Sequence, residues 1–348
     1  MKAIVKARAV PGALELREVP SPTPAAHEVL IQVTKTAICG TDIHIYKWDE
    51  WAQKTIKTPQ IIGHEFVGKV LEVGAGVTHI KPGQLVSGEG HIVCGGCRHC
   101  ITGSLHLCRQ TIGVGVNCDG VFSEYITLPA SNTWICDEKI SPYILSMLDP
   151  LGNATHTALA FNILGEDVLV TGAGPIGLMS IPILKRAGAR NIVVTDINPA
   201  RLDMAKQLGA TATINVRQQS LESYLSTHSS TLNIKEGFDI GLEMSGNAAA
   251  FLDMVNAMAN GGKIALLGII PSDAPIDWNK VVFNSLTIKG IYGRQMYDTW
   301  YRMAALLQSG LDKEIEPIIT HRFHYEQFDE AFACASSGES GKIILEWS

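Results

Sequence analysis

Residues 167–180 read DVLVTGAGPIGLMS and carry the first clear sign of the fold. A short apolar run is followed at once by Gly172, Gly174 and Gly177 in the spacing G-x-G-x-x-G, and then by a helical pattern. Glycines at this spacing permit a tight turn, a close approach of a pyrophosphate and close packing of the helix, whose N-terminus favours phosphate charge. The context of strand, turn and helix therefore favours a dinucleotide site over a glycine-rich turn that binds nothing.

The acidic residue after the next apolar run bears on which dinucleotide binds. Asp196 ends that run, 19 residues after Gly177. A carboxylate there can accept hydrogen bonds from the ribose hydroxyls and repel a 2′-phosphate, which favours NAD over NADP. Arg201 is the opposing observation, because a nearby arginine can hold a 2′-phosphate, although it can also line the adenosine pocket. We expect NAD as the cofactor.

Strands and helices alternate after this segment, with helices predicted over 175–187, 199–208 and 248–259. This alternation is the signal for βαβ units, and six strands match a Rossmann doubly wound parallel sheet in an α/β protein. The expected strands are DVLVTG (167–172), NIVVTD (191–196), ATATINV (210–216), FDIGLEMSG (238–246), KIALLG (263–268) and LTIKGIYG (286–293).

The first 150 residues follow a different pattern, in which short β-branched runs are broken by turn residues. They predict a β-rich domain of irregular strands. After about residue 294, a long helical pattern and a final KIILEWS run do not extend the parallel sheet, so we expect this tail to return to the first domain. The predicted organisation is therefore a domain of 1–150 completed by 294–348, and a nucleotide-binding domain of 151–293.

Length and charge exclude several classes of protein. The 348 residues suggest about two domains at roughly 150 residues each. The net charge of −6 shows no basic footprint for nucleic acid or an anionic membrane. The longest uncharged stretch, 168–184, is shorter than the roughly 20 residues of a membrane span, and charges interrupt the N-terminal apolar residues that a secretory signal would need. We expect a soluble cytoplasmic protein with no nucleic-acid or membrane partner.

Four of the eight cysteines lie within fifteen residues, spaced C-x2-C-x2-C-x7-C. In a reducing compartment such a cluster favours metal ligation over disulfides. Zinc is favoured, because four thiolates on one loop can surround it tetrahedrally. An iron–sulfur cluster fits less well, since the ferredoxin spacing differs and usually ends in Cys-Pro, and free buried cysteines would not explain the density. The four are Cys94, Cys97, Cys100 and Cys108.

A second group of possible metal ligands lies earlier in the chain. Cys39 is followed 25 residues later by His64 and Glu65. A thiolate, an imidazole and a carboxylate from separate loops would suffice for a catalytic zinc with an open position, although a lone cysteine is most often a small core residue. Thr41 and His44 could relay a proton, or be a turn cap and a surface imidazole. Asp149 could approach the metal or cap a helix.

Together these motifs resemble the zinc-dependent medium-chain alcohol dehydrogenase superfamily over nearly the whole chain. Cys39, the G-H-E sequence at 63–65, the four-cysteine lobe and the glycine motif occur in the order typical of that family. Within it, the resemblance to the L-threonine 3-dehydrogenases is closest in ICGTDIHIYKWDEWAQKTI (38–56), LDPLGNATHTAL (148–159), GLEMSGN (241–247), IDWNKVVF (276–283) and KGIYGR (289–294).

The resemblance implies a β-rich GroES-like catalytic domain, an inserted Rossmann domain, a homotetramer and two Zn²⁺ per subunit. It implies that Cys39, His64 and Glu65 hold a catalytic zinc and that the four-cysteine lobe holds a structural one. Thr41 and His44 match the proton-relay pair, Asp149 matches a residue near the zinc in a supporting role, and His91 resembles a residue near the substrate. Positions that line the NAD site match Ile176, Asp196, Arg201, Leu267, Gly268, Ile269, Ile291 and Tyr292.

The activity that the resemblance implies is oxidation of the L-threonine 3-hydroxyl to 2-amino-3-oxobutanoate, with hydride passing to NAD. The zinc chemistry itself does not involve the amino group of threonine. A dehydrogenase of a polyol such as sorbitol or butanediol is therefore the alternative within the same class. A sensor that binds NADH and zinc without turnover is the alternative from another class.

Overall fold

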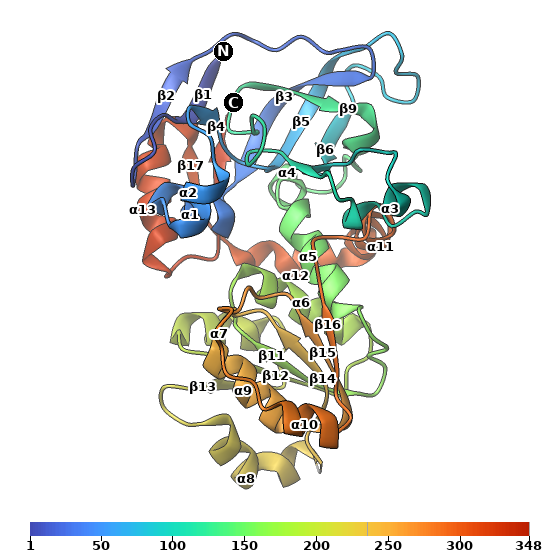
Figure 1. Ribbon diagram of the computed structural model, residues 1–348, viewed down its shortest axis with the longest axis vertical. Coiled ribbons are helices and arrows are strands. Elements are labelled where there is room, and N and C mark those ends of the chain that lie inside the picture. The colour runs from blue at the N-terminus through green and yellow to red at the C-terminus, as the bar shows by residue number, and fades with distance from the viewer. Residues whose placement is uncertain (235, 348) are drawn as a thin grey trace. The chain divides into compact units, whose positions relative to one another are not determined.

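The computed structural model describes residues 1–234 and 236–347. Two units make up the chain, with Met1–Pro150 and Ile319–Ser348 in the first and Leu151–Ile318 in the second (Figure 1). No helix in the described ranges combines the length and the apolar character that crossing a bilayer requires.

The return of the chain to the first unit comes at Ile319, later than the sequence-based boundary at residue 294. The intervening residues form α11 (Asp298–Leu306), a π-helical turn (Leu307–Leu311) and α12 (Asp312–Ile315). Several of their apolar side chains are buried, including those of Trp300, Met303, Leu307, Leu311 and Ile315. Arg186 at the end of α6 (Pro175–Arg186) also pairs with Glu314 at 2.8 Å. This packing keeps the segment in the second unit.

The second unit contains a six-stranded, wholly parallel sheet in the order β13-β12-β11-β14-β15-β16. The order reverses between β11 and β14, so the predicted doubly wound α/β fold is confirmed. Each strand overlaps one of the six expected runs. They are β11 (Asp167–Thr171), β12 (Asn191–Asp196), β13 (Ala212–Asn215), β14 (Phe238–Glu243), β15 (Met258–Leu266) and β16 (Thr287–Gly290).

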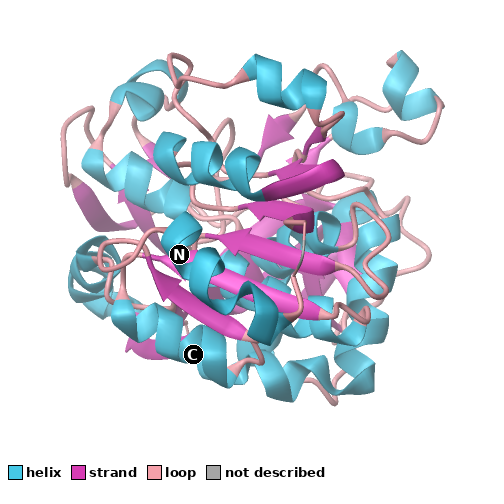
Figure 2. Ribbon diagram, turned by 90° about the horizontal axis from the view of Figure 1, so that it is seen from below, coloured by secondary structure: helices cyan, strands magenta, loops and turns pink. Residues whose placement is uncertain are grey.

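Helices flank this sheet (Figure 2). Two of them begin at strong caps, because the side chains of Asn198 and Asn247 accept hydrogen bonds from the free backbone N–H groups of the first turn. The strand β11 is buried along its whole length, and Leu169 packs in one core with Val193, Phe251 and Ile264. Besides α6, the helices are α5 (Leu148–Ala158), α7 (Pro199–Gln207), α8 (Leu221–Leu232), α9 (Ala248–Ala257) and α10 (Trp278–Phe283).

The first unit is rich in β-strands, as predicted, and its strands pair antiparallel except for β17, which runs parallel to β18. Its larger sheet has the order β10-β6-β5-β3-β18-β17 with β9 also paired to β3, its smaller sheet is β2-β1-β4, and β7 pairs with β8. The strands are β1 (Lys2–Lys6), β2 (Leu14–Glu18), β3 (Glu28–Ala37), β4 (Gln60–Ile61), β5 (Glu65–Val73), β6 (Leu85–Gly88), β7 (His91–Ile92), β8 (Ile112–Gly113), β9 (Tyr125–Pro129), β10 (Thr133–Ile135), β17 (Ile319–His324) and β18 (Lys342–Glu346).

Short helices connect these strands. They are α1 (Gly40–Lys47), α2 (Glu50–Thr55), α3 (Arg98–Ile101), α4 (Pro142–Leu145) and α13 (Phe328–Ser337). Single 3₁₀ turns occur at Leu105–Leu107, Ala130–Asn132, Glu316–Ile318 and Tyr325–Gln327.

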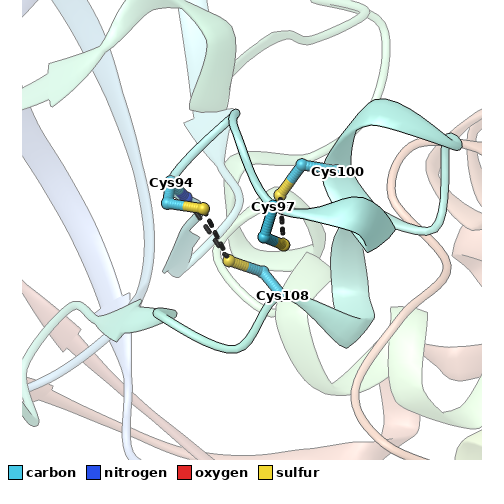
Figure 3. A group of neighbouring side chains, drawn as sticks. All are labelled: Cys94, Cys97, Cys100 and Cys108. Carbon is cyan, nitrogen blue, oxygen red and sulfur yellow. Dashed lines mark hydrogen bonds between the residues drawn. The ribbon is translucent and has the colours of Figure 1, made fainter.

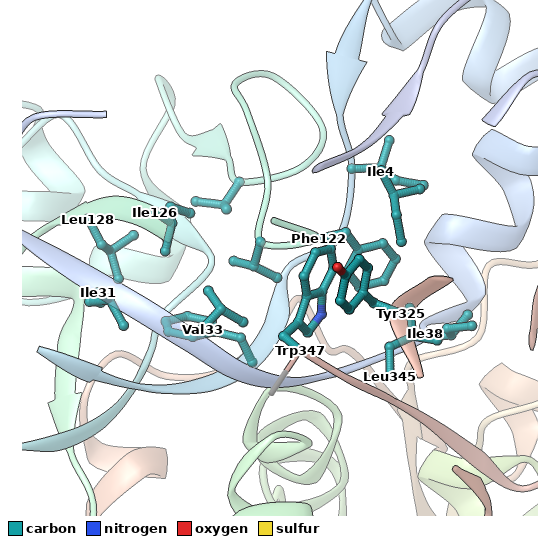
Figure 4. Close-up of a cluster of buried hydrophobic side chains, with 14 of the residues drawn as sticks. Ile4, Ile31, Val33, Ile38, Phe122, Ile126, Leu128, Tyr325, Leu345 and Trp347 are labelled. Atoms are coloured by element: carbon teal, nitrogen blue, oxygen red, sulfur yellow. The ribbon is translucent and has the colours of Figure 1, made fainter. Parts of the chain in front are cut away.

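The C-terminal strand is anchored in the core of the first unit (Figure 4). β18 pairs with β3, with Ile344 opposite Ala37. The ring of Trp347 stacks on that of Tyr325 with centroids 4.6 Å apart, and its Nε1–H donates to Oγ1 of Thr36 at 2.9 Å. Burying each large apolar side chain contributes about 1.5–3 kcal/mol. β18 and Trp347 therefore belong to the same core as the first strands.

Candidate functional site

Strand pairing in the first unit brings Cys39, His64 and Glu65 together. In the antiparallel pair of β3 and β5, Ala37 lies opposite Glu65, so Cys39 just after β3 and His64 just before β5 lie at the same end of the ladder. One ligand atom from each of the three side chains lies within 4.8 Å of the other two. The structure thus assembles the predicted group from positions 25 residues apart in sequence.

The loop before β5 depends on Gly63. Its φ is +88°, and a Cβ atom there would lie 2.2 Å from the ring of Phe122. The carbonyl oxygen of Gly63 accepts a hydrogen bond from the N–H of Val121 at 3.0 Å, and that of Ile62 accepts one from Phe122. A residue with a side chain at position 63 would displace this segment and, with it, His64.

A buried lysine from the far end of the chain contacts this group. Nζ of Lys342 lies 2.5 Å from Oε2 of Glu65 and donates to the carbonyl oxygen of Ile38 at 2.8 Å. Burial raises the pKa of the Glu65 carboxyl above its usual range, although Lys342 acts in the opposite direction. Burial also disfavours the charged form of Lys342, but the Glu65 and Cys39 charges outweigh it and hold the pKa of Lys342 above its ordinary value.

The group has the donors and the charge that a zinc ion requires. Nδ1 of His64 is buried without a hydrogen-bond partner, 3.9 Å from Oδ1 of the buried Asp42. Although burial acts against it, the charges of Cys39 and Asp42 raise the pKa of His64 well above its ordinary value, so this environment favours a cation. A thiol, an imidazole and a carboxyl group also match the three-ligand set of catalytic zinc sites, which leave one position open.

Of the other predicted site residues, Thr41 and Asp149 lie near this group. Oγ1 of Thr41 lies 3.8 Å from Sγ of Cys39, and His44 is exposed one turn later on α1. Asp149 is buried in the first turn of α5, and its charge adds to burial in raising the pKa of Glu65, but it is not one of the three residues whose ligand atoms converge. His91, on β7, lies with Nδ1 3.0 Å from Oε1 of the buried Glu89.

The four-cysteine lobe forms a second convergent group (Figure 3). Sγ of Cys97 lies 3.6 Å from that of Cys100, and the sulfurs of Cys94 and Cys108 are separated by the same distance. Thiolates about 2.3 Å from a tetrahedral zinc would lie roughly 3.8 Å apart, whereas a disulfide would place them at about 2.0 Å. Backbone N–H groups of Cys100 and Arg109 lower the pKa of Cys97 to about 6, which favours the thiolate that binds metal.

The glycine motif has the backbone geometry of a nucleotide-binding turn. Gly172 has a φ of +91°, and a Cβ at Gly177 would lie 2.0 Å from the carbonyl oxygen of Gly172. A Cβ at Gly174 would meet nothing within 4 Å, so open space lies above this turn at the N-terminus of α6. These are the three roles that the spacing requires: a left-handed turn, close helix packing and room for a ligand.

A pocket of about 510 Å³ opens beside this turn. It is lined by Gly172, Gly174, Asp196 and Arg201 of the predicted cofactor residues. The two oxygens of Asp196 accept hydrogen bonds from the backbone N–H groups of Ala173, Ile197 and Asn198. Nε of Arg201 is buried with no hydrogen-bond partner. Sequence reasoning missed other residues of the lining, among them Arg217, Met244, Ser245, Asn247 and Asp253.

The other predicted cofactor residues lie outside the lining of this pocket. Ile176 and Gly177 are in the first turn of α6. The rest follow the carboxyl ends of β15 and β16, the sheet edge that carries ligands in doubly wound folds. Ile269 is 94% exposed and Tyr292 is 56% exposed. This second set consists of Leu267, Gly268, Ile269, Ile291 and Tyr292.

Sequence reasoning also missed three charged residues of the first unit. Asp42 accepts a hydrogen bond from the N–H of Cys39 at 2.9 Å, Asp49 contacts His44, and Lys342 contacts Glu65. Asp42 lies on α1 and Asp49 caps α2, both within ten residues of Cys39, so local spacing could have indicated them. Lys342 had no local signal, because only the pairing of β18 with β3 brings it near the group.

Comparison with known proteins identifies the family. The Alcohol dehydrogenase GroES-like domain matches residues 25–138 and the Zinc-binding dehydrogenase family matches residues 175–309. The chain is 55% identical, over the full length of both proteins, to the L-threonine 3-dehydrogenases of Chromobacterium violaceum and Solibacter usitatus. An alcohol dehydrogenase from Escherichia coli CFT073 in complex with NADH superposes with a TM-score of 0.89 at 28% identity, covering 100% of this chain and 99% of that one. The chain therefore belongs to the zinc-dependent medium-chain alcohol dehydrogenase superfamily and, within it, to the L-threonine 3-dehydrogenase family.

Proposed function

We propose that this protein oxidises the 3-hydroxyl of L-threonine to give 2-amino-3-oxobutanoate, with NAD as the hydride acceptor. The observation that carries the proposal is the convergence of Cys39, His64 and Glu65 at one buried point beside Thr41. Full-length identity of 55% to L-threonine 3-dehydrogenases supports the choice of substrate.

Cys39, His64 and Glu65 would hold the catalytic zinc. Bound there, zinc supplies Lewis acidity that lowers the pKa of a substrate hydroxyl toward neutrality. Oγ1 of Thr41 lies next to the Cys39 sulfur, so its hydroxyl can accept the proton of the 3-hydroxyl while giving up its own proton toward His44. His44 is exposed and can release that proton to water. The buried carboxylate of Asp149 contributes negative charge beside the ligands.

The second unit would bind the dinucleotide. The turn at Gly172, Gly174 and Gly177 would receive the pyrophosphate, and the pocket beside Asp196 and Arg201 would receive the adenosine. Bound NAD supplies the nicotinamide ring that accepts hydride. Asp196 supports NAD over NADP, because its carboxylate would repel a 2′-phosphate. We place Ile176, Leu267, Gly268, Ile269, Ile291 and Tyr292 along the rest of the cofactor.

A second zinc per subunit would be structural. Cys94, Cys97, Cys100 and Cys108 have sulfur separations close to those of a tetrahedral zinc site, and all four are free of disulfides. Reduced thiols of this kind fit the cytoplasm, where we place the protein.

We further propose that the subunits form a homotetramer. Strand β16 is an edge of the parallel sheet, and the helix before it carries large apolar side chains in solvent. Trp278 is 62% exposed and Phe283 is 82% exposed. An exposed apolar surface of this kind beside an open sheet edge favours pairing with a second copy. Light scattering after size-exclusion chromatography measures the subunit number directly.

A substrate panel tests the proposed activity. NADH formation would be followed with L-threonine, sorbitol and 2,3-butanediol, using NAD and NADP, before and after chelation and after zinc is restored. We expect the highest kcat/KM with L-threonine and NAD, loss of activity on chelation and recovery with zinc. Preference for a polyol would overturn the substrate assignment, and binding of NADH and zinc without turnover on any alcohol would identify a sensor.

A further inference from the structure

A carboxylate contacts the outer member of the proposed proton relay. Nδ1 of His44 forms a short hydrogen bond with Oδ2 of Asp49. The contact is possible because Trp48 ends α1 in the left-handed conformation, with φ 55° and ψ 48°, which turns the chain back toward His44. The N–H of Asp49 then donates to the carbonyl oxygen of His44 at 3.4 Å.

The carboxylate is held in place independently of this contact. Asp49 is the N-cap of α2, and its Oδ1 accepts a hydrogen bond from the N–H of Ala52 at 3.0 Å. Although partial burial acts in the opposite direction, the N–H of Ala52 and the His44 ring hold the pKa of Asp49 below its ordinary value. Asp49 is therefore ionised at neutral pH and held in one orientation. Its Oδ1 is bound to the first turn of α2 and its Oδ2 to the imidazole.

Asp49 is the acidic residue that contacts the His44 ring, because the neighbouring acidic residue is paired elsewhere. The neighbouring Glu50 is paired with Lys54 at 2.6 Å on the exposed side of α2. The ring of Trp51 lies edge-on to the imidazole with centroids 6.2 Å apart, which restricts the tilt of the ring. The His44 side chain is 60% exposed, so a proton that reaches it can pass to water.

We propose that Asp49 is a positioning residue for proton release, acting through His44. The carboxylate accepts the Nδ1–H hydrogen bond and so selects the tautomer in which Nε2 is unprotonated. Nε2 takes the proton arriving from Thr41, the ring becomes an imidazolium that Asp49 stabilises, and Nε2 then gives the proton to water. Asp49 stays ionised throughout, as expected for a carboxylate that orients an imidazole base. This inference rests on the relay of the proposed function.

The substitution Asp49→Asn separates this role from helix capping. Asparagine caps a helix N-terminus as well as aspartate does, so α2 should be retained. The amide is neutral and can present an N–H to Nδ1, which favours the wrong tautomer. We expect kcat with L-threonine to fall at least about tenfold, with KM for L-threonine and the Kd for NADH changed by less than about twofold.

Three comparisons make the test decisive. Asp49→Glu should recover part of kcat, and Glu50→Gln should match the parent protein. In a His44→Ala background, Asp49→Asn should cause no further loss, because its effect passes through His44. An equal loss in that background would overturn the inference in favour of a structural role. If Asp49→Asn keeps the parental kcat while His44→Ala loses activity, the role of Asp49 is overturned but the relay stands. If His44→Ala itself keeps the parental kcat, the relay of the proposed function is overturned as well.

Discussion

Nζ of Lys342 lies 2.5 Å from Oε2 of Glu65, and both side chains are buried. The strand that carries Lys342 is the last of the chain, and the carboxylate that it meets is one of the three convergent donors of the first unit. In the absence of metal, the lysine is the cation nearest to this carboxylate. A zinc ion held by this group would therefore compete with Lys342 for the same negative charge.

Replacing the lysine should make the protein more dependent on zinc. Removing one partner of a buried ion pair typically costs about 3–5 kcal/mol, because the other charge is left uncompensated. We expect Lys342→Met to lower the Tm of the chelated protein strongly and to enlarge the rise in Tm when zinc is added. Calorimetry with and without zinc measures both, with Lys342→Arg as the charge-retaining control. The same zinc-induced rise in Lys342→Met and the parent would contradict the competition.

Loss of the proposed thiolate ligand should remove activity without unfolding the chain. Lewis-acid stabilisation is worth several kcal/mol, and each 1.4 kcal/mol is a factor of ten in rate, so Cys39→Ser should reduce kcat roughly a thousandfold. The circular dichroism spectrum and the Kd for NADH should be unchanged. Cys334→Ser, on α13 and outside the three convergent ligands, is the matched control. Full activity in Cys39→Ser would exclude the proposed ligand set.

The four-cysteine lobe should contribute stability. We expect Cys97→Ser to reduce the zinc content from two to one per subunit and to lower Tm by about 5 °C or more, since each kcal/mol shifts Tm by roughly 2–4 °C in a unit of this size. Zinc analysis and thermal unfolding give the two numbers, and Cys118→Ser should match the parent. Two zinc ions in Cys97→Ser would mean that this sulfur is not a ligand.

Asp196 should govern the choice between NAD and NADP. Hydrogen bonds to a charged group contribute about 1.5–3 kcal/mol, so Asp196→Ala should reduce the ratio of kcat/KM for NAD to that for NADP by roughly tenfold to a hundredfold. The variant also leaves the N–H groups of Ala173, Ile197 and Asn198 without their acceptor, so a moderate loss of stability should accompany it. An unchanged ratio, measured by steady-state kinetics, would exclude Asp196 as the selecting residue.

His156 should make the second unit less stable in mild acid. Burial lowers the pKa of His156, whose Nδ1–H donates to the carbonyl oxygen of Gly293 at 2.8 Å. Between the lowered pKa and the ordinary value of 6.5, the unfolded chain binds more protons at this site, so the free energy of unfolding falls as pH decreases below 6.5.

The substitution His156→Gln should reduce that dependence. Urea midpoints at pH 7, 6 and 5 should decline less steeply for the variant than for the parent protein. Parallel declines would show that His156 does not titrate differently in the folded and unfolded states.

Much of the second unit could be predicted from local sequence. The central strands β11, β12 and β14 are short apolar runs that are largely buried in the parallel sheet, and the glycine spacing determines the turn between β11 and α6. The helix α8 was not expected, because its sequence LESYLSTHSSTL is polar and buries only Leu221. The observed return to the first unit, at Ile319, differs from the predicted one at residue 294, because the apolar pattern of 294–318 indicates that the segment packs on a sheet but not on which one.

The two metal-ligand groups differ in how much local sequence reveals. The four cysteines share one loop, so their spacing alone indicated a site. Cys39 and His64 required the register of β3 and β5, and the resemblance to a family supplied what spacing left open. Lys342 is 277 positions from Glu65, and no periodicity in the sequence links residues at that separation. Contacts that depend on tertiary pairing of distant strands were therefore missed.

The position of β18 has a consequence for biosynthesis. Because β18 lies between β3 and β17, the sheet of the first unit stays open until β18 has left the ribosome. The second unit, Leu151–Ile318, is complete in the nascent chain before then and can fold first. Cys39, His64 and Glu65 are made earlier than β18, yet β3, which leads to Cys39, gains its β18 neighbour only after that strand is made. Assembly of this group therefore follows synthesis of β18, so a chain cut before Lys342 would have the nucleotide-binding unit without the strand that supports the metal-ligand group.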